Sequence, residues 1–147
     1  MENKEILKLL KKLLSEVKSK SDNNFEGLGL IVYKDFVNLP IIPFNDEKCI
    51  RLPIKDFSVI VDTLLKISNC HNEFHDGFHL ISKEFQLTHI SNYFSTPIIE
   101  KIKIEKKYGS RYRTALYGSF LPNVLFTAVL SKNYGPIIFE KGRALSY

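Results

Sequence analysis

Apolar and charged side chains alternate at helical spacing through the first residues of the chain. Leucine, isoleucine and valine recur at every third or fourth position from Ile6 to Val17, while lysine and glutamate occupy the other side. This pattern predicts an amphipathic helix from Met1 to about Lys18. We expect residues 1–20 to pack on the remaining domain, residues 21–147, or to extend from it.

Two further helices are predicted. An apolar stripe that begins after Pro53 predicts a helix ending near Asn69. A shorter helix is expected to begin with Ser110 as its N-cap and to run through Leu116 or Tyr117.

Apolar runs bounded by turn residues predict the strands. They lie at residues 27–33, 78–82, 87–90, 123–130 and 137–140. Prolines interrupt residues 34–51, which we expect to form a turn with a short strand or loop. The alternation of helices and strands predicts an α/β fold, a single domain with a mixed central β-sheet flanked by helices.

Composition is that of an ordinary globular domain. The 147 residues are 44% hydrophobic and 25% charged, which suits one domain. No apolar run approaches the roughly 20 residues of a membrane span, and the amino terminus lacks the apolar core of a signal peptide. We therefore expect a cytoplasmic protein without a membrane segment, in which Cys49 and Cys70 are free, buried thiols.

The net charge of +5 permits an anionic partner. Its lysines are spread along the chain, whereas nucleic-acid binding favours a dense basic stripe, so a small anionic ligand is preferred over nucleic acid. The most basic segment, residues 101–107, alternates charged and apolar side chains. It predicts the exposed face of a strand or helix edge, with a phosphate-attracting rim as the alternative.

The first candidate for chemistry is the tripeptide His75-Asp76-Gly77, just before a predicted strand. A carboxylate beside a glycine can hold a divalent metal close to the backbone, and the histidine offers a second ligand. Asp-Gly is also a common turn dipeptide. The motif alone therefore supports two interpretations, a metal-binding loop and an ordinary turn. His79, which follows on the strand, is expected to be structural.

The second candidate is the segment Gly109–Arg113 at the start of the predicted short helix. Cations are unfavourable near a helix N-terminus, so Arg111 and Arg113 at this place indicate a bound anion. Guanidinium groups and first-turn amides together can grip a triphosphate. The alternative is a solvated helix start. The sequence has no glycine-rich P-loop and no nucleophile elbow, so P-loop and hydrolase functions have little support. Taken together, the two candidate segments suggest a nucleotide site.

The order of the motifs resembles the diadenylate cyclase domain. Members of that family carry Asp-Gly-Ala, Gly-Thr-Arg-His-Arg-Ala-Ala and Ser-Glu-Glu-Thr-Gly motifs, and the matching segments here are His75–Phe78, Gly109–Ala115 and Ser131–Gly135. The resemblance covers residues 27–147. It implies a diadenylate cyclase-like fold and the condensation of two ATP molecules into cyclic di-AMP with release of pyrophosphate. It also implies a homodimer or higher homo-oligomer with face-to-face sites.

The resemblance further implies roles for individual residues. Asp76 would lie beside Mg²⁺ or Mn²⁺ and activate the ribose 3′-hydroxyl, with His75 as a further metal ligand. Arg111 and Arg113 would hold the phosphates during catalysis as pyrophosphate leaves. The other residues implied to contact the nucleotide are Gly77, Phe78, Ser110, Tyr112, Thr114 and Ser131.

Several positions depart from the family motifs. Phe78 replaces a small alanine, Tyr112 replaces the central histidine, and Lys132 and Asn133 replace two acidic residues. An amide is a weaker ligand than a carboxylate for a hard cation, so Asn133 predicts reduced metal affinity. Two hypotheses follow. One is a divergent diadenylate cyclase; the alternative is a catalytically inactive cyclase-like domain that binds or senses a nucleotide or cyclic dinucleotide.

Overall fold

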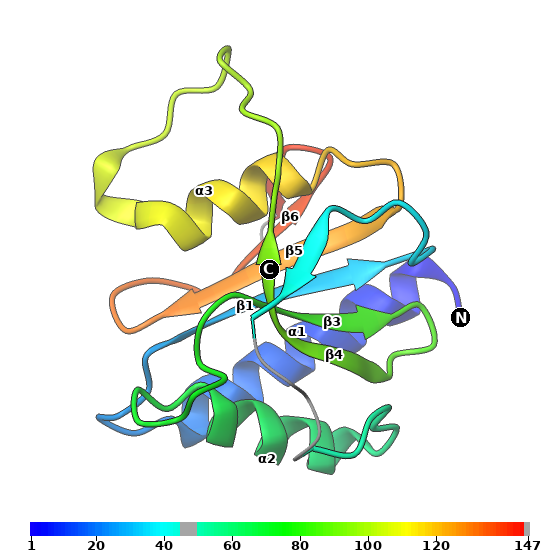
Figure 1. The fold of residues 1–147 in the computed structure, drawn as a ribbon, viewed down its shortest axis with the longest axis vertical. Helices are drawn as coiled ribbons and strands as arrows, with labels where there is room; N and C mark the ends of the chain where they lie inside the picture. Colours follow the sequence, from blue (N-terminus) through cyan, green and yellow to red (C-terminus); the bar gives the residue numbers. More distant parts are fainter. Residues whose placement is uncertain (45–49, 146–147) are drawn as a thin grey trace.

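The computed structural model describes residues 1–44 and 50–145, in which strands and helices form one α/β domain (Figure 1). The helices are α1 (Asn3–Lys20), α2 (Phe57–Ile67) and α3 (Gly109–Gly118), and a 3₁₀ turn (Lys106–Tyr108) precedes α3. The strands are β1 (Gly27–Tyr33), β2 (Ile41–Pro43), β3 (Phe78–Ser82), β4 (Leu87–Phe94), β5 (Val124–Ser131), β6 (Ile137–Glu140) and β7 (Arg143–Leu145).

The strands form a single seven-stranded sheet with the order β2-β4-β3-β1-β5-β6-β7. The central pair β1 and β3 is parallel, with Leu30 opposite His79, and the other neighbouring pairs are antiparallel. Parallel strands need a long crossover, and α2 supplies part of it between β1 and β3. The prediction of a mixed sheet in an α/β domain is confirmed.

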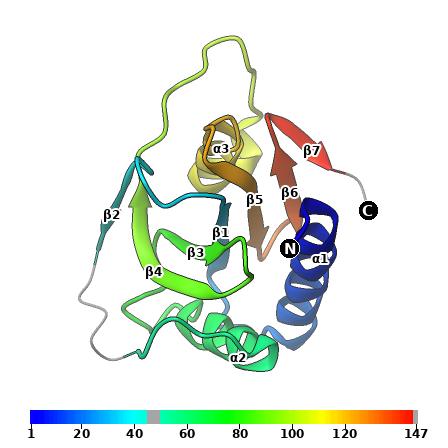
Figure 2. The ribbon, with the colours of Figure 1, turned by 90° about the vertical axis from the view of Figure 1, so that its right-hand side faces the viewer.

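Helices cover both faces of the sheet (Figure 2). On one face, the buried stripe of α1 packs with that of α2 and with inward residues of β1 and β5 to form the main core. The predicted first helix is therefore α1, with its apolar side inside the domain. Each fully buried side chain, such as Leu10 or Leu64, contributes about 1.5–3 kcal/mol. No helix of the described residues is long and apolar enough to cross a bilayer.

A smaller core fixes α3 on the opposite face. The Thr127 hydroxyl of β5 donates a hydrogen bond to the Ala115 carbonyl of α3 at 2.6 Å. On the same helix, the Tyr112 ring packs edge-on against Phe139 of β6, with 5.0 Å between ring centroids. These contacts hold the first turns of α3 at a fixed height above the sheet.

Three local predictions are wrong. Ser110 is not an N-cap, because the 3₁₀ turn already places Tyr108 in helical conformation and α3 begins at Gly109. Cys70 is exposed rather than buried, because α2 ends at Ile67 and leaves this thiol in a turn. Cys49 lies outside the described residues.

The third correction concerns the basic segment. Residues 101–105 form no regular strand or helix edge and lead into the 3₁₀ turn. The alternation nevertheless has a structural cause. Ile102 and Ile104 are half-buried against the smaller core, while Lys101, Lys103 and Glu105 are exposed.

Candidate functional site

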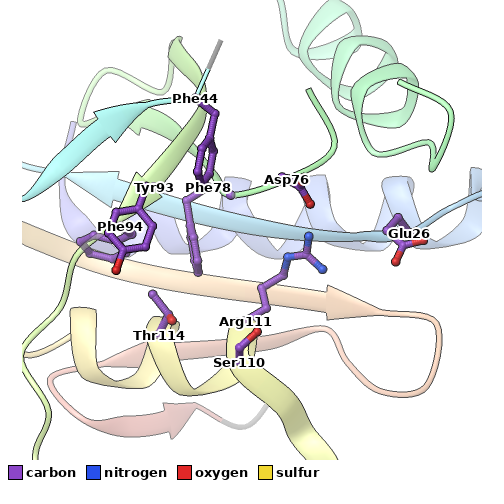
Figure 3. Close-up of a pocket in the computed structure, with 10 residues that line it drawn as sticks. Glu26, Phe44, Asp76, Phe78, Tyr93, Phe94, Ser110, Arg111 and Thr114 are labelled. Atoms are coloured by element: carbon purple, nitrogen blue, oxygen red, sulfur yellow. The ribbon is translucent and has the colours of Figure 1, made fainter. Parts of the chain in front are cut away.

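A pocket of about 380 Å³ lies where β3 begins, between β4 and the first turns of α3 (Figure 3). Its size falls within the roughly 300–1,000 Å³ typical of small-molecule sites. The lining residues are Glu26, Phe44, Asp76, Gly77, Phe78, Tyr93, Phe94, Ser110, Arg111 and Thr114. The pocket thus joins parts of the first two motifs, which are far apart in the sequence.

Arg111 connects these two motifs directly. Its Nη2 donates a hydrogen bond to the His75 carbonyl at 3.3 Å. Its side chain also crosses Gly27 of β1 so closely that a Cβ there would lie 2.5 Å from Nη1. The missing side chain of Gly27 therefore makes room for the guanidinium. The hydrogen bond to His75 and the close contact with Gly27 together hold the Arg111 side chain in one orientation.

Opposite charges surround the Arg111 guanidinium. Burial lowers the pKa of Arg111, and the neighbouring Tyr134, Asp76 and Glu26 act in the opposite direction. Figure 3 shows the guanidinium directed toward the space between the Asp76 and Glu26 side chains. Arginine stays protonated at any physiological pH, so this corner holds a permanent cation beside two carboxylates.

Asp76 is open to solvent at the pocket, with its side chain 71% exposed. The His75 Nδ1 atom lies 3.3 Å from Asp76 Oδ1, yet it is shielded from solvent and makes no hydrogen bond within the described structure. Among residues 1–44 and 50–145, no group of three or more His, Cys, Asp or Glu side chains is placed to hold a metal.

The donors of the pocket nevertheless fit a divalent metal that is shared with a ligand. Asp76 and Glu26 both present carboxylates to the same cavity. Mg²⁺ prefers oxygen ligands and is commonly bound through one or two carboxylates, with substrate phosphates and water completing its shell. These two carboxylates are oxygen donors of the type that Mg²⁺ and Mn²⁺ prefer, and a metal here would need further ligands.

Gly77 is explained by close packing. Its φ of +79° lies in the left-handed region, and a Cβ at this position would collide with the Asn92 carbonyl of β4 and lie 2.7 Å from Phe44 Cε2. A larger residue would push β4 and the Phe44 ring away from the loop. Because Gly77 has no side chain, β4 and the Phe44 ring pack against the loop and close this side of the pocket.

The other end of the pocket is aromatic. Phe44 and Tyr93 are each half exposed and meet edge to face at 6.0 Å between centroids. Behind them, Phe78 and Phe94 are buried and also meet edge to face, at 5.4 Å. The Phe78 ring lies over Gly29, where a Cβ would come within 2.8 Å of it. One end of the cavity is therefore charged and the other offers flat apolar surface.

Four predicted site residues lie outside this pocket lining, and one of them is the predicted metal ligand His75. The Tyr112 ring stacks on Tyr108 at 4.3 Å between centroids, and Arg113 is exposed on α3. Ser131 lines a neighbouring cavity of about 370 Å³ together with Lys132. The roles of Tyr112, Arg113 and Ser131 toward a nucleotide remain predictions.

Four lining residues were not predicted. Phe44, Tyr93 and Phe94 belong to or adjoin the edge pair β2 and β4. Between β4 and its other neighbour β3, an irregularity around Ser91, with φ +56°, disturbs the alternation of the strand. Glu26 directly precedes the first strand. The sequence signal for Glu26 is its place directly before a buried strand, which indicates only that the residue lies at a strand end.

Solved structures with a similar fold include DacA from Staphylococcus aureus, a diadenylate cyclase, in a double cysteine mutant. The TM-score is 0.65 and the identity 17%, over 97% of this chain and 87% of that one. A hypothetical membrane spanning protein from Bacillus cereus gives a TM-score of 0.66 and 18% identity, over 90% of this chain and 61% of that one. This chain thus spans less than two thirds of the Bacillus chain. No family model and no curated protein matches it. The comparison shows a diadenylate cyclase-like fold.

Proposed function

We propose that this protein binds ATP in the pocket and condenses two ATP molecules into cyclic di-AMP, as a divergent diadenylate cyclase. The observation that carries the proposal is the convergence of Asp76 from one motif with Ser110, Arg111 and Thr114 from another on one cavity. The similarity of the fold to that of DacA supports the same function. An ATP substrate agrees with the expected cytoplasmic location.

The charged end of the pocket suits the triphosphate. Ser110 and Arg111 lie in the first turn of α3, and the N-terminal end of a helix favours anions. The Arg111 guanidinium adds charge-assisted hydrogen bonds to phosphate oxygens, and its orientation is already fixed by His75 and Gly27. Little conformational entropy is then lost when phosphate binds.

The aromatic end suits the base. Phe44 and Tyr93 expose ring surface to the cavity, and a purine can pack against it. A nucleotide laid along the pocket would place its base near these rings and its phosphates near Arg111. Its ribose would then lie at the middle of the cavity, close to Asp76.

With the ribose beside Asp76 and the phosphates beside Arg111, the following reaction is proposed. The Asp76 carboxylate accepts the proton of the ribose 3′-hydroxyl, whose oxygen attacks the α-phosphorus of the second ATP. A new oxygen–phosphorus bond forms as the bond to the β-phosphate breaks, and pyrophosphate leaves. Arg111 stabilises the negative charge that develops on the phosphates. A bound Mg²⁺ or Mn²⁺, for which Asp76 and His75 are the proposed ligands, supplies further charge neutralisation. Because each pocket holds one ATP, the reaction requires two copies of the chain face to face.

The test is incubation of the purified protein with ATP and either Mg²⁺ or Mn²⁺, followed by chromatography of the products. We expect cyclic di-AMP from the wild type and none from Asp76→Asn, which removes the charge of an exposed side chain and leaves the core untouched. Asp62→Asn makes the same change on the exposed side of α2 and should keep full activity. A wild-type protein that binds ATP tightly but yields no cyclic product with either metal would refute catalysis.

A second function, nucleotide binding without catalysis, is favoured by one observation. Lys132 and Asn133 stand where the family that this chain resembles has two acidic residues. Lys132 Nζ lies 3.9 Å from Oε2 of Glu26, which lines the pocket. Calorimetric titration with ATP and with cyclic di-AMP tests this function. Binding should weaken in Arg111→Ala but not in Arg143→Ala, which removes an exposed arginine of β7. A protein that binds neither ligand has neither proposed function.

A further inference from the structure

Glu26 belongs to none of the three motifs, yet its carboxylate lines the same pocket as Asp76 (Figure 3). The residue is placed by the sheet. Gly27 pairs with Ser131 across the antiparallel strands β1 and β5, so Glu26 and Lys132 face each other one step beyond the last pair. The backbone of Glu26 is also anchored, since its N–H donates to the Ser68 carbonyl at 2.7 Å.

The Glu26 carboxylate is held loosely. Its side chain is 43% exposed, and its ion pair with Lys132 spans 3.9 Å, too long for a hydrogen bond. Within the described residues, no hydrogen bond fixes the carboxylate elsewhere. Its oxygens are therefore accessible from the cavity.

Arg111 already supplies one positive charge beside the two carboxylates, so a further cation is favoured when an anionic nucleotide adds negative charge. Both lie close enough to Arg111 to raise its pKa, although neither forms a direct ion pair with it among the described contacts. A nucleotide whose phosphates reach Arg111 would bring several further negative charges beside Asp76 and Glu26. Carboxylate and phosphate groups in one pocket repel each other, whereas their oxygens together are the ligands that Mg²⁺ and Mn²⁺ prefer.

We propose that Glu26 is the second carboxylate of the pocket for the divalent cation that accompanies the nucleotide, acting together with Asp76. The inference rests on the proposed nucleotide site. In this chain the negative charge that Asn133 cannot provide then comes from Glu26, which faces Lys132 just beyond the paired ends of β1 and β5.

The experiment compares ATP binding with and without metal. Wild type and Glu26→Gln are titrated calorimetrically with ATP in the presence of Mn²⁺ and again in a chelator, and protein-bound Mn²⁺ is followed by electron paramagnetic resonance. With Mn²⁺, we expect Glu26→Gln to bind ATP about tenfold more weakly, because a charged oxygen ligand is lost. In the chelator, we expect it to bind ATP more tightly than the wild type, because a repelling charge is gone.

Two variants serve as controls. Glu26→Asp keeps a carboxylate and should bind Mn²⁺ and ATP more tightly than Glu26→Gln, which separates the ligand role from a folding defect. Glu84→Gln, an exposed position in the turn between β3 and β4, should match the wild type in both conditions.

The test rests on two opposite changes in the ATP affinity of Glu26→Gln, a loss with Mn²⁺ and a gain in the chelator. Equal affinities of Glu26→Gln and the wild type with Mn²⁺, or the same change with and without metal, would refute the role of Glu26 while leaving the proposed function intact. A wild type that binds no ATP in either condition overturns the proposed function, and this inference with it.

Discussion

Mild acid is expected to destabilise this protein through one histidine. The His79 side chain of β3 is completely buried, and its Nδ1 accepts a hydrogen bond from the Ser91 N–H at 3.0 Å. Burial, with a smaller contribution from the charge of Arg111, lowers the pKa of His79 from 6.5 to about 3. The folded protein therefore keeps this ring neutral where an unfolded chain would protonate it.

The sign and size of the effect follow from proton linkage. Because the folded pKa is lower than the unfolded one, stability is fully present above pH 6.5 and falls as the pH drops toward 3. Each pH unit within that window costs about 1.4 kcal/mol. Acidification from pH 7 to pH 5 crosses about one and a half such units and should lower the free energy of unfolding by about 2 kcal/mol.

Urea denaturation at pH 7, 6 and 5 measures this free energy. The matched variant is His79→Asn, whose side-chain oxygen can still accept from the Ser91 N–H but does not titrate. It should be less stable at pH 7 because the smaller side chain leaves a cavity, and it should lack the histidine contribution to the pH slope. Equal slopes for the two proteins would show that His79 does not carry the effect, and the argument from burial would fail.

Two further changes test the anchoring of α3 and of its arginine. Gly27→Ala should displace the Arg111 guanidinium, because the new Cβ would lie 2.5 Å from Nη1. This variant should bind ATP about tenfold more weakly. Unchanged affinity in calorimetry would contradict this expectation. Thr127→Val removes the hydrogen bond to the Ala115 carbonyl, which still accepts from the Ser119 N–H, and should cost about 1 kcal/mol in urea denaturation. A cost near zero would mean that this bond adds nothing beyond packing.

The larger elements were predictable because their signals are local. The helical stripe between Ile6 and Val17 and the apolar runs that became β1 and β5 are properties of neighbouring residues. β7 (Arg143–Leu145) went unpredicted and β2 only as a short strand or loop, because short edge strands depend on pairing with β6 and β4 rather than on their own composition. Pro43 also made β2 look like a loop, although an edge strand tolerates proline.

The site was predictable only in part, for the same reason. Asp76 and Arg111 lie in recognisable motifs, and the structure brings both to one pocket. Glu26 and Tyr93 have no motif, because they reach the pocket through strand pairing and through the bulge at Ser91. Such long-range geometry is not encoded in any short stretch of sequence.

The order of strands also has a consequence for how the chain folds. β1 is buried at all seven positions, but its partners β3 and β5 lie much later in the sequence, with Gly27 paired to Ser131. Closing such long loops costs entropy before the contacts repay it, so sheets of this kind fold slowly. During synthesis, one hydrogen-bonding edge of β1 stays unpaired until β5 has been made. The centre of the sheet, and with it the contact between Gly27 and Arg111, forms late.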